Sequence, residues 1–170
     1  MTKRETVYLT GFMGAGKTTC GKLLAEKLSL PFIDLDDWIQ KHHKKSIPAI
    51  FAEEGEAGFR KRELDALKTV SGSAAVVSTG GGIVETPEAR NLLSKNSCFY
   101  LSAPFEELFK RIEGDASRPL ALLEKPKLQE RYDKRVPLYE ECGYCIDSEK
   151  LTPEELCEKL AGMLHKRDPM

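Results

Sequence analysis

The sequence of 170 residues lacks the features that define several classes of protein. No apolar run approaches the ~18 residues that a membrane-spanning helix needs, so we expect no membrane partner. The formal net charge is −1, and without a basic excess a general nucleic-acid role is not expected. An N-K-x-D motif is absent, which argues against a GTPase switch. The first residues, MTKRETVYLTG, contain no signal-peptide core, so we expect a cytoplasmic protein.

Cysteine is scarce, and its five residues form an odd, scattered set. Without an export signal, reduced thiols are the expected state. Cys142 and Cys145 form a C-x-x-C pair that Cys157 and His165 could complete as a zinc site. The latter pair lacks the usual spacing, so packing is the better explanation for these cysteines.

Strand-like runs that alternate with helical patterns predict an α/β fold with a five-stranded parallel sheet and helices on both faces. Such sheets bind ligands beyond the carboxyl ends of their strands. The predicted strands are Val7–Leu9, Phe32–Asp34, Ala75–Ser78, Cys98–Leu101 and Tyr144–Asp147. The predicted helices are Lys17–Leu28, Trp38–Lys44, Ile47–Glu54, Gly58–Val70, Pro87–Ser94, Phe105–Ile112, Lys127–Glu141 and Pro153–His165.

A glycine-rich segment, GFMGAGKTT, follows the first predicted strand and has the spacing G-x-x-x-x-G-K-T from Gly11 to Thr18. Glycines allow successive N–H groups to turn inward as a nest for an anion, and the helix N-terminus adds unpaired N–H groups. Lys17 would reach the β- and γ-phosphates of a nucleotide, and the Thr18 hydroxyl would ligate Mg²⁺. The alternative is a glycine-rich turn that only caps a helix. The context of strand and helix favours a phosphate-binding loop.

Acidic and glycine-rich segments follow the next two predicted strands. If the second strand continues through Asp36, the Asp34 and Asp36 carboxylates share one face. One could then hold Mg²⁺ through water while the other accepts a proton from a hydroxyl. The alternative is an N-cap, at Asp36 or Asp37, with an acidic first helical turn. The glycines at 80–82 could bring N–H groups against a phosphate or a polyol, or could form an ordinary tight turn.

Four arginines are candidates for binding anions. Two of Arg60, Arg62 and Arg135 could together grip a carboxylate, since guanidinium binds carboxylate through two parallel hydrogen bonds. Arg118 lies in a long non-periodic segment, about residues 113–125, which is typical of a lid that closes on a transferring phosphoryl group. The alternatives are solvated helix positions for the first three and a mobile loop for Arg118.

Six segments in order resemble the shikimate kinase family, within the nucleoside-monophosphate-kinase-like P-loop fold. They are GFMGAGKTT, FIDLDDWI, GEAGFRKRE, STGGGIV, SRPL and YDKRVPLYEE, and the resemblance covers Thr10 to Leu164. It implies one three-layer kinase domain over residues 1–170, with a substrate-binding helical segment at about 35–62 and a lid. It also implies transfer of the ATP γ-phosphoryl group to the 3-hydroxyl of shikimate, on the route to aromatic amino acids. A gluconate kinase or another small-molecule P-loop kinase is the alternative.

The resemblance further implies residue roles and partners. The catalytic residues would be Lys17, Asp36 and Arg118. Those that bind ATP would be Gly14, Ala15, Gly16, Lys17, Thr18, Thr19, Arg111, Arg118 and Pro153. Those that bind shikimate would be Asp36, Arg60, Gly80, Gly81, Gly82 and Arg135. Thr18 and, through water, Asp34 would hold Mg²⁺. We expect a monomer that departs from the family pattern at Pro48 and Ala49 and in the lid sequence RPLAL.

Overall fold

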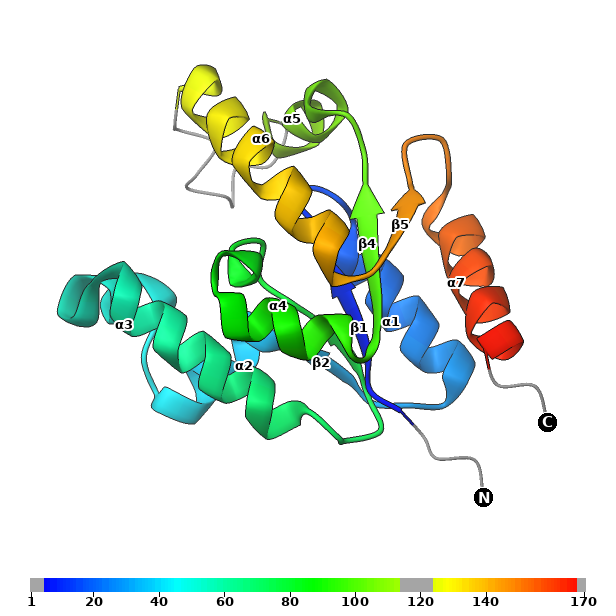
Figure 1. Ribbon diagram of the computed structural model, residues 1–170, viewed down its shortest axis with the longest axis horizontal. Helices are drawn as coiled ribbons and strands as arrows, with labels where there is room; N and C mark the ends of the chain where they lie inside the picture. Colours follow the sequence, from blue (N-terminus) through cyan, green and yellow to red (C-terminus); the bar gives the residue numbers. More distant parts are fainter. Residues whose placement is uncertain (1–4, 114–123, 168–170) are drawn as a thin grey trace.

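The computed structural model describes residues 5–113 and 124–167 (Figure 1). Residues 1–4, 114–123 and 168–170 are not described. Arg118 and most of the expected lid therefore lie outside the described residues.

Five parallel strands form one sheet in the order β2-β3-β1-β4-β5. Their bounds are Val7–Thr10 (β1), Phe32–Asp34 (β2), Val76–Ser78 (β3), Ser97–Ser102 (β4) and Tyr144–Asp147 (β5). The predicted parallel sheet is confirmed. The bounds of β2 and β5 agree with the prediction, β1 and β3 differ by one residue at one end, and β4 is one residue longer at each end. β1 is the central strand, and all four of its residues are buried because helices cover both of its faces.

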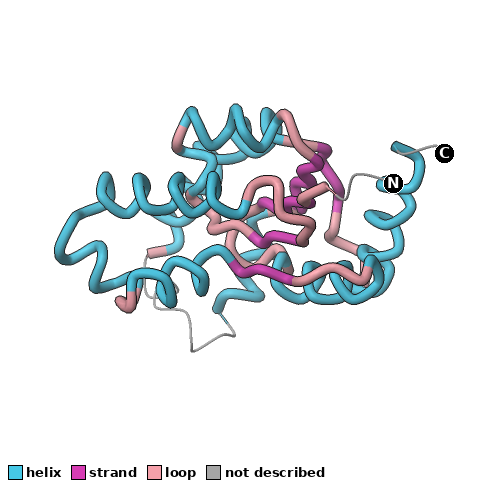
Figure 2. Tube along the Cα trace, turned by 90° about the horizontal axis from the view of Figure 1, so that it is seen from below, coloured by secondary structure: helices cyan, strands magenta, loops and turns pink. Residues whose placement is uncertain are grey.

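Helices flank the sheet on both faces, which gives the three layers (Figure 1, Figure 2). α1 and α7 pack against each other on one face, and α4 and α6 cover the other face, with α5 beside α6. In the described part of the chain, no helix is long and apolar enough to cross a membrane. The bounds are Lys17–Leu28 (α1), Pro87–Ser94 (α4), Phe105–Glu113 (α5), Lys125–Cys142 (α6) and Pro153–Arg167 (α7).

Two further helices, α2 (Leu35–His43) and α3 (Ile47–Val70), extend beyond the β2 edge of the sheet (Figure 1). α3 joins two helical stretches across a kink at Gly55, which lies in the break between the two predicted helices, Ile47–Glu54 and Gly58–Val70. Gly55 interrupts it with φ 71° and ψ −176°, a backbone conformation open mainly to glycine, so the sequence break appears as a kink. The part of α3 that follows this kink carries the residues that face the carboxyl edge of the sheet.

Candidate active site

The loop between β1 and α1, residues 11–18, is called the phosphate cradle below. Gly14 and Gly16 have φ of 84° and 89°, which side chains other than glycine rarely adopt. Gly16 is the N-cap residue of α1, and no side chain caps this helix or places an acid in its first turn. A helix N-terminus presents N–H groups that take partners from outside the helix, and it carries the positive end of the helix dipole. The cradle is therefore built to receive an anion.

Two basic side chains border the cradle. Nζ of Lys17 donates to the carbonyl oxygens of Gly11, at 2.5 Å, and Phe12, at 3.2 Å. From α5, Nη1 of Arg111 donates to the carbonyl oxygen of Gly14 at 3.1 Å. Both predicted residues thus lie where their charge can face a bound phosphate chain.

Oxygen ligands suited to Mg²⁺ meet beside the cradle. The Thr18 hydroxyl lies 3.5 Å from Oδ2 of Asp34, at the end of β2. A hydroxyl and a carboxylate are hard oxygen donors, which are the ligands that this ion prefers. The residues present therefore fit the expected Mg²⁺ site.

The structure corrects the expected geometry of the two aspartates. β2 ends at Asp34, so a strand that continues through Asp36 is wrong as the reason for their proximity. Asp34 is the N-cap of α2: its backbone is extended and its Oδ1 accepts from the backbone N–H of Asp37 at 3.1 Å. α2 consequently begins at Leu35 rather than Trp38, and the cap is neither Asp36 nor Asp37.

Asp36 lies in the first turn of α2 and carries an oxygen that could accept a hydrogen bond from a ligand. Its Oδ1 is buried and has no hydrogen-bond partner among the described residues. Burial, together with the nearby charge of Asp34, raises the pKa of Asp36. A β-carbon at Gly80 would lie 3.0 Å from this Oδ1, so the glycine loop passes directly beside it. A buried, unpartnered carboxylate oxygen of raised pKa is a good acceptor for the proton of a bound hydroxyl.

Arg60 from α3 and Arg135 from α6 are brought together, as expected. Nη2 of each lies close to Oε2 of Glu85, at 3.2 Å for Arg60 and 3.1 Å for Arg135. Arg60 also donates from Nη1 to Oε1 of Glu63 at 3.0 Å. Arg135 is buried, so neither arginine is an ordinary solvated helix residue. These four side chains are called the guanidinium clamp below.

Glu63 and Glu85 were missed by reasoning from the sequence. Glu63 is only 1% exposed, and burial raises its pKa to about 7, although Arg60 opposes this. The spacing of Arg60 and Glu63, three residues apart on one helix, is a signal that could have found it. Glu85 gives no such signal, because its position depends on the short 3₁₀ helix η1 (Ile83–Glu85) that follows the glycine loop.

The glycine loop, residues 80–82, is held from both sides. Thr79 donates from its backbone N–H and its hydroxyl to the carbonyl oxygen of Leu9 on β1, at 3.1 and 2.9 Å. The Tyr139 hydroxyl, on α6, donates to the carbonyl oxygen of Gly81 at 2.5 Å. The loop therefore lies between the cradle and the clamp, and η1 follows it at once. Pro153, by contrast, is an exposed residue at the start of α7.

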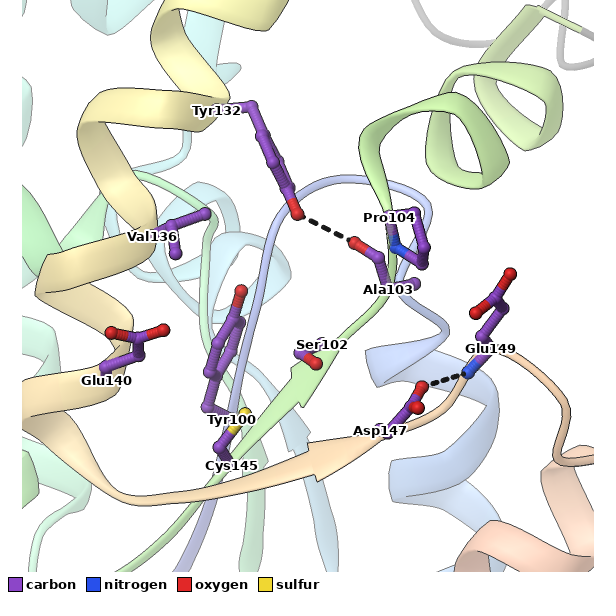
Figure 3. A pocket seen from close by; sticks show the side chains of 10 residues that line it. All are labelled: Tyr100, Ser102, Ala103, Pro104, Tyr132, Val136, Glu140, Cys145, Asp147 and Glu149. Carbon is purple, nitrogen blue, oxygen red and sulfur yellow. Dashed lines mark hydrogen bonds between the residues drawn. The ribbon is translucent and has the colours of Figure 1, made fainter.

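A hollow of about 310 Å³ lies elsewhere, between α6 and the carboxyl ends of β4 and β5 (Figure 3). Three acidic side chains line it, and none of the described lining residues is basic. Such a lining would repel a polyphosphate, so the hollow does not fit the nucleotide site. Cys145 of the C-x-x-C pair lines this hollow, and no three His, Cys, Asp or Glu side chains of the described residues are grouped as a metal site. The acidic residues are Glu140, Asp147 and Glu149.

A cradle at the end of the central strand, beside a buried carboxylate and paired guanidinium groups, defines a P-loop kinase of small molecules. Comparison with known families shows to which kinase family the chain belongs. The model of the family described as shikimate kinase matches residues 13–165, and the chain belongs to this family.

Individual relatives are similar to this chain in sequence over nearly its full length. The shikimate kinase of Enterococcus faecalis is 45% identical over 165 residues, which cover 94% of this chain and 98% of that protein. That of Thermodesulfovibrio yellowstonii is 41% identical over 160 residues, or 92% of each chain. The structure of shikimate kinase from Acinetobacter baumannii in complex with shikimate has a TM-score of 0.89 at 36% identity and covers 98% of this chain and 96% of that chain. A gluconokinase from Sinorhizobium meliloti, at 14% identity and a TM-score of 0.60, shares the fold alone.

Proposed function

We propose that this chain carries out the reaction of its family with the side chains described above. The chain is an ATP-dependent kinase that transfers the γ-phosphoryl group of ATP to the 3-hydroxyl of shikimate. Family membership is the observation that supports the activity. The convergence of the cradle, Asp36 and the clamp at one edge of the sheet supports the residue roles.

On the donor side, the N–H groups of residues 14–19 hold the phosphates of ATP. Lys17 leaves the loop carbonyls and binds the β- and γ-phosphates, where it stabilises the charge that develops during transfer. Thr18, and Asp34 through water, would hold Mg²⁺; when bound, this ion neutralises phosphate oxygens. Arg111 and Pro153 border the adenine, with Arg111 already in contact with the cradle.

On the acceptor side, Asp36 binds the hydroxyl groups of shikimate and acts as the base. The bond from the 3-oxygen to the γ-phosphorus forms, the bond from that phosphorus to the β-phosphate oxygen breaks, and the hydroxyl proton passes to Asp36. A carboxylate of raised pKa suits this step, because it takes up a proton more readily than an exposed one. ADP and shikimate 3-phosphate leave.

Arg60 and Arg135 bind the carboxylate of shikimate, while Gly80, Gly81 and Gly82 contact its ring hydroxyls. A carboxylate between two guanidinium groups can form several charge-assisted hydrogen bonds. Arg118 is assigned to the transferring phosphoryl group from the family resemblance, and it lies outside the described residues. We further propose that residues 1–170 act as one kinase domain, as a cytoplasmic monomer.

An acceptor assay tests the function. ATP consumption is measured with shikimate, gluconate and nucleoside monophosphates as alternative acceptors. We expect saturable turnover with shikimate and background consumption with the others, because shikimate is the acceptor of the family to which the chain belongs. Comparable turnover with gluconate would make the chain a kinase of broader or different specificity.

A further inference from the structure

The guanidinium groups of Arg60 and Arg135 already hold an anion between them. A single oxygen of Glu85, Oε2, accepts from Nη2 of Arg60 at 3.2 Å and from Nη2 of Arg135 at 3.1 Å. A ligand carboxylate in the same place would need these donors, because each guanidinium presents its N–H groups in one planar fork. Glu85 and such a ligand therefore exclude each other.

The other carboxylate in the clamp, that of Glu63, cannot move away from the arginines. Glu63 accepts from Nη1 of Arg60 at 3.0 Å and is 1% exposed, so its side chain has no route into solvent. The Glu85 side chain is 39% exposed. Glu56 also lies near Nη2 of Arg60, at 3.6 Å, but it is 67% exposed and does not contact Arg135. Glu85 is therefore the exposed acid that holds both arginines, and its turn into water leaves both of them to a ligand.

The backbone that carries Glu85 is fixed. Its N–H donates to the carbonyl oxygen of Gly82 at 3.0 Å, and the preceding residues Ile83 and Val84 are fully buried. Arg90 donates to the carbonyl oxygen of Val84 at 2.7 Å. Release of the arginines therefore needs only a rotation of the Glu85 side chain between staggered rotamers, without movement of η1.

We propose that Glu85 is an internal competitor for the acceptor's carboxylate and sets both affinity and selectivity for the acceptor. This inference rests on the proposed function of the clamp. The apparent dissociation constant rises as the fraction of molecules with Glu85 released falls. An anion that contacts only the two arginines cannot displace Glu85, whereas one that also places hydroxyls on Asp36 can.

Calorimetric titration with shikimate, without nucleotide, tests the competition. Glu85→Gln keeps the size of the side chain and removes its charge, and we expect it to bind shikimate about 5- to 50-fold more tightly than the wild type. Glu88→Gln is the matched control, since Glu88 is exposed, lies three residues away and pairs with Lys68 at 3.4 Å. Its affinity should stay within about twofold of the wild type. Glu85→Ala, at the same half-exposed position, gives a second variant with the same expected direction.

Shikimate methyl ester separates competition from a general change in the pocket. The ester has no carboxylate, so the loss of Glu85 should leave its affinity within about twofold. Equal or weaker shikimate binding by both Glu85 variants would overturn the inference, as would tighter binding of the ester to the same extent as the acid. A wild-type protein that does not bind shikimate would instead refute the proposed function, and the inference with it.

Discussion

The phosphate cradle and the guanidinium clamp lie at the same edge of the sheet but are built in different ways. The cradle uses backbone N–H groups of consecutive residues from 11 to 18, held by β1 and α1. The clamp uses side chains from α3, η1 and α6, which lie up to 75 positions apart, from Arg60 to Arg135. A backbone site keeps its donors when side chains change, whereas a side-chain site can be altered at each position. Under the roles proposed above, donor binding is the fixed part of this enzyme and acceptor binding the adjustable part.

The largest effect is expected when the cradle loses the positive charge of Lys17. Lys17→Met should lower kcat by at least about 10²- to 10³-fold, because a positive group that stabilises the transferring phosphoryl is lost. Shikimate binding without nucleotide should be unchanged, since the clamp is untouched. Initial rates and calorimetry measure both quantities.

The control for this variant is Lys22→Met, an exposed lysine on α1 that is not in the cradle. It should keep wild-type turnover. A Lys17 variant that retained normal kcat would remove this residue from the chemistry and leave only the backbone as donor.

A variant of the clamp should instead lose affinity for shikimate and keep its affinity for ATP. Arg60→Ala should weaken shikimate binding by about 2–4 kcal/mol, because a desolvated carboxylate loses a charged partner. The affinity for ATP should not change. Arg62→Ala is matched to it on the same helix, since Arg62 pairs with Glu54 rather than with the clamp. Equal loss of shikimate affinity in both variants would contradict the role of Arg60.

A smaller effect should appear in the free energy of unfolding of the protein as the pH changes, because of Glu63 in the clamp. The pKa of Glu63 is raised from 4.5 to about 7 by burial. The folded state therefore holds this proton more tightly than the unfolded state, and the stability that results is lost as the pH rises from 4.5 through 7. We expect this group to lower the free energy of unfolding by roughly 1–3 kcal/mol between pH 5 and pH 8.

Denaturant titrations at several pH values measure this slope. Glu63→Gln should remove the contribution of Glu63, while Asp65→Asn, an exposed acid on the same helix, should retain it. If both variants kept the slope of the wild type, Glu63 would not be the group that titrates.

The smallest effect concerns the cradle backbone. Gly16→Ala should destabilise the fold by about 1–2 kcal/mol, because alanine is strained at φ 89° although its β-carbon would meet no atom within 4 Å. Gly162→Ala, in α7 and equally uncrowded, should instead stabilise by up to about 1 kcal/mol. Thermal unfolding compares the two. A neutral Gly16 variant would show that the cradle does not depend on this conformation.

The same contrast explains what the sequence could predict. The cradle was predicted from local spacing, because Gly11 to Thr18 are contiguous and the motif fixes their geometry. The predicted meeting of Arg60 with Arg135 rested on resemblance, since no local pattern relates α3 to α6. The N-cap at Asp34 was missed because three neighbouring aspartates offered the same chemistry, and only the backbone decides which one caps. Glu85 could not be found, because a turn of 3₁₀ helix sets its direction.

The strand order has a consequence for what surrounds the glycine loop. β3 lies between β1 and β2, so the loop that follows it lies between the cradle and the start of α2. A β-carbon at Gly81 would lie 3.6 Å from the Gly11 carbonyl oxygen, and one at Gly80 would lie 3.0 Å from the Asp36 carboxylate. A side chain at Gly80 would press on the Asp36 carboxylate, whereas one at Gly81 would make only an ordinary contact with the cradle. The bare main chain at Gly80 therefore keeps open the space that our proposal gives to the hydroxyl of the acceptor.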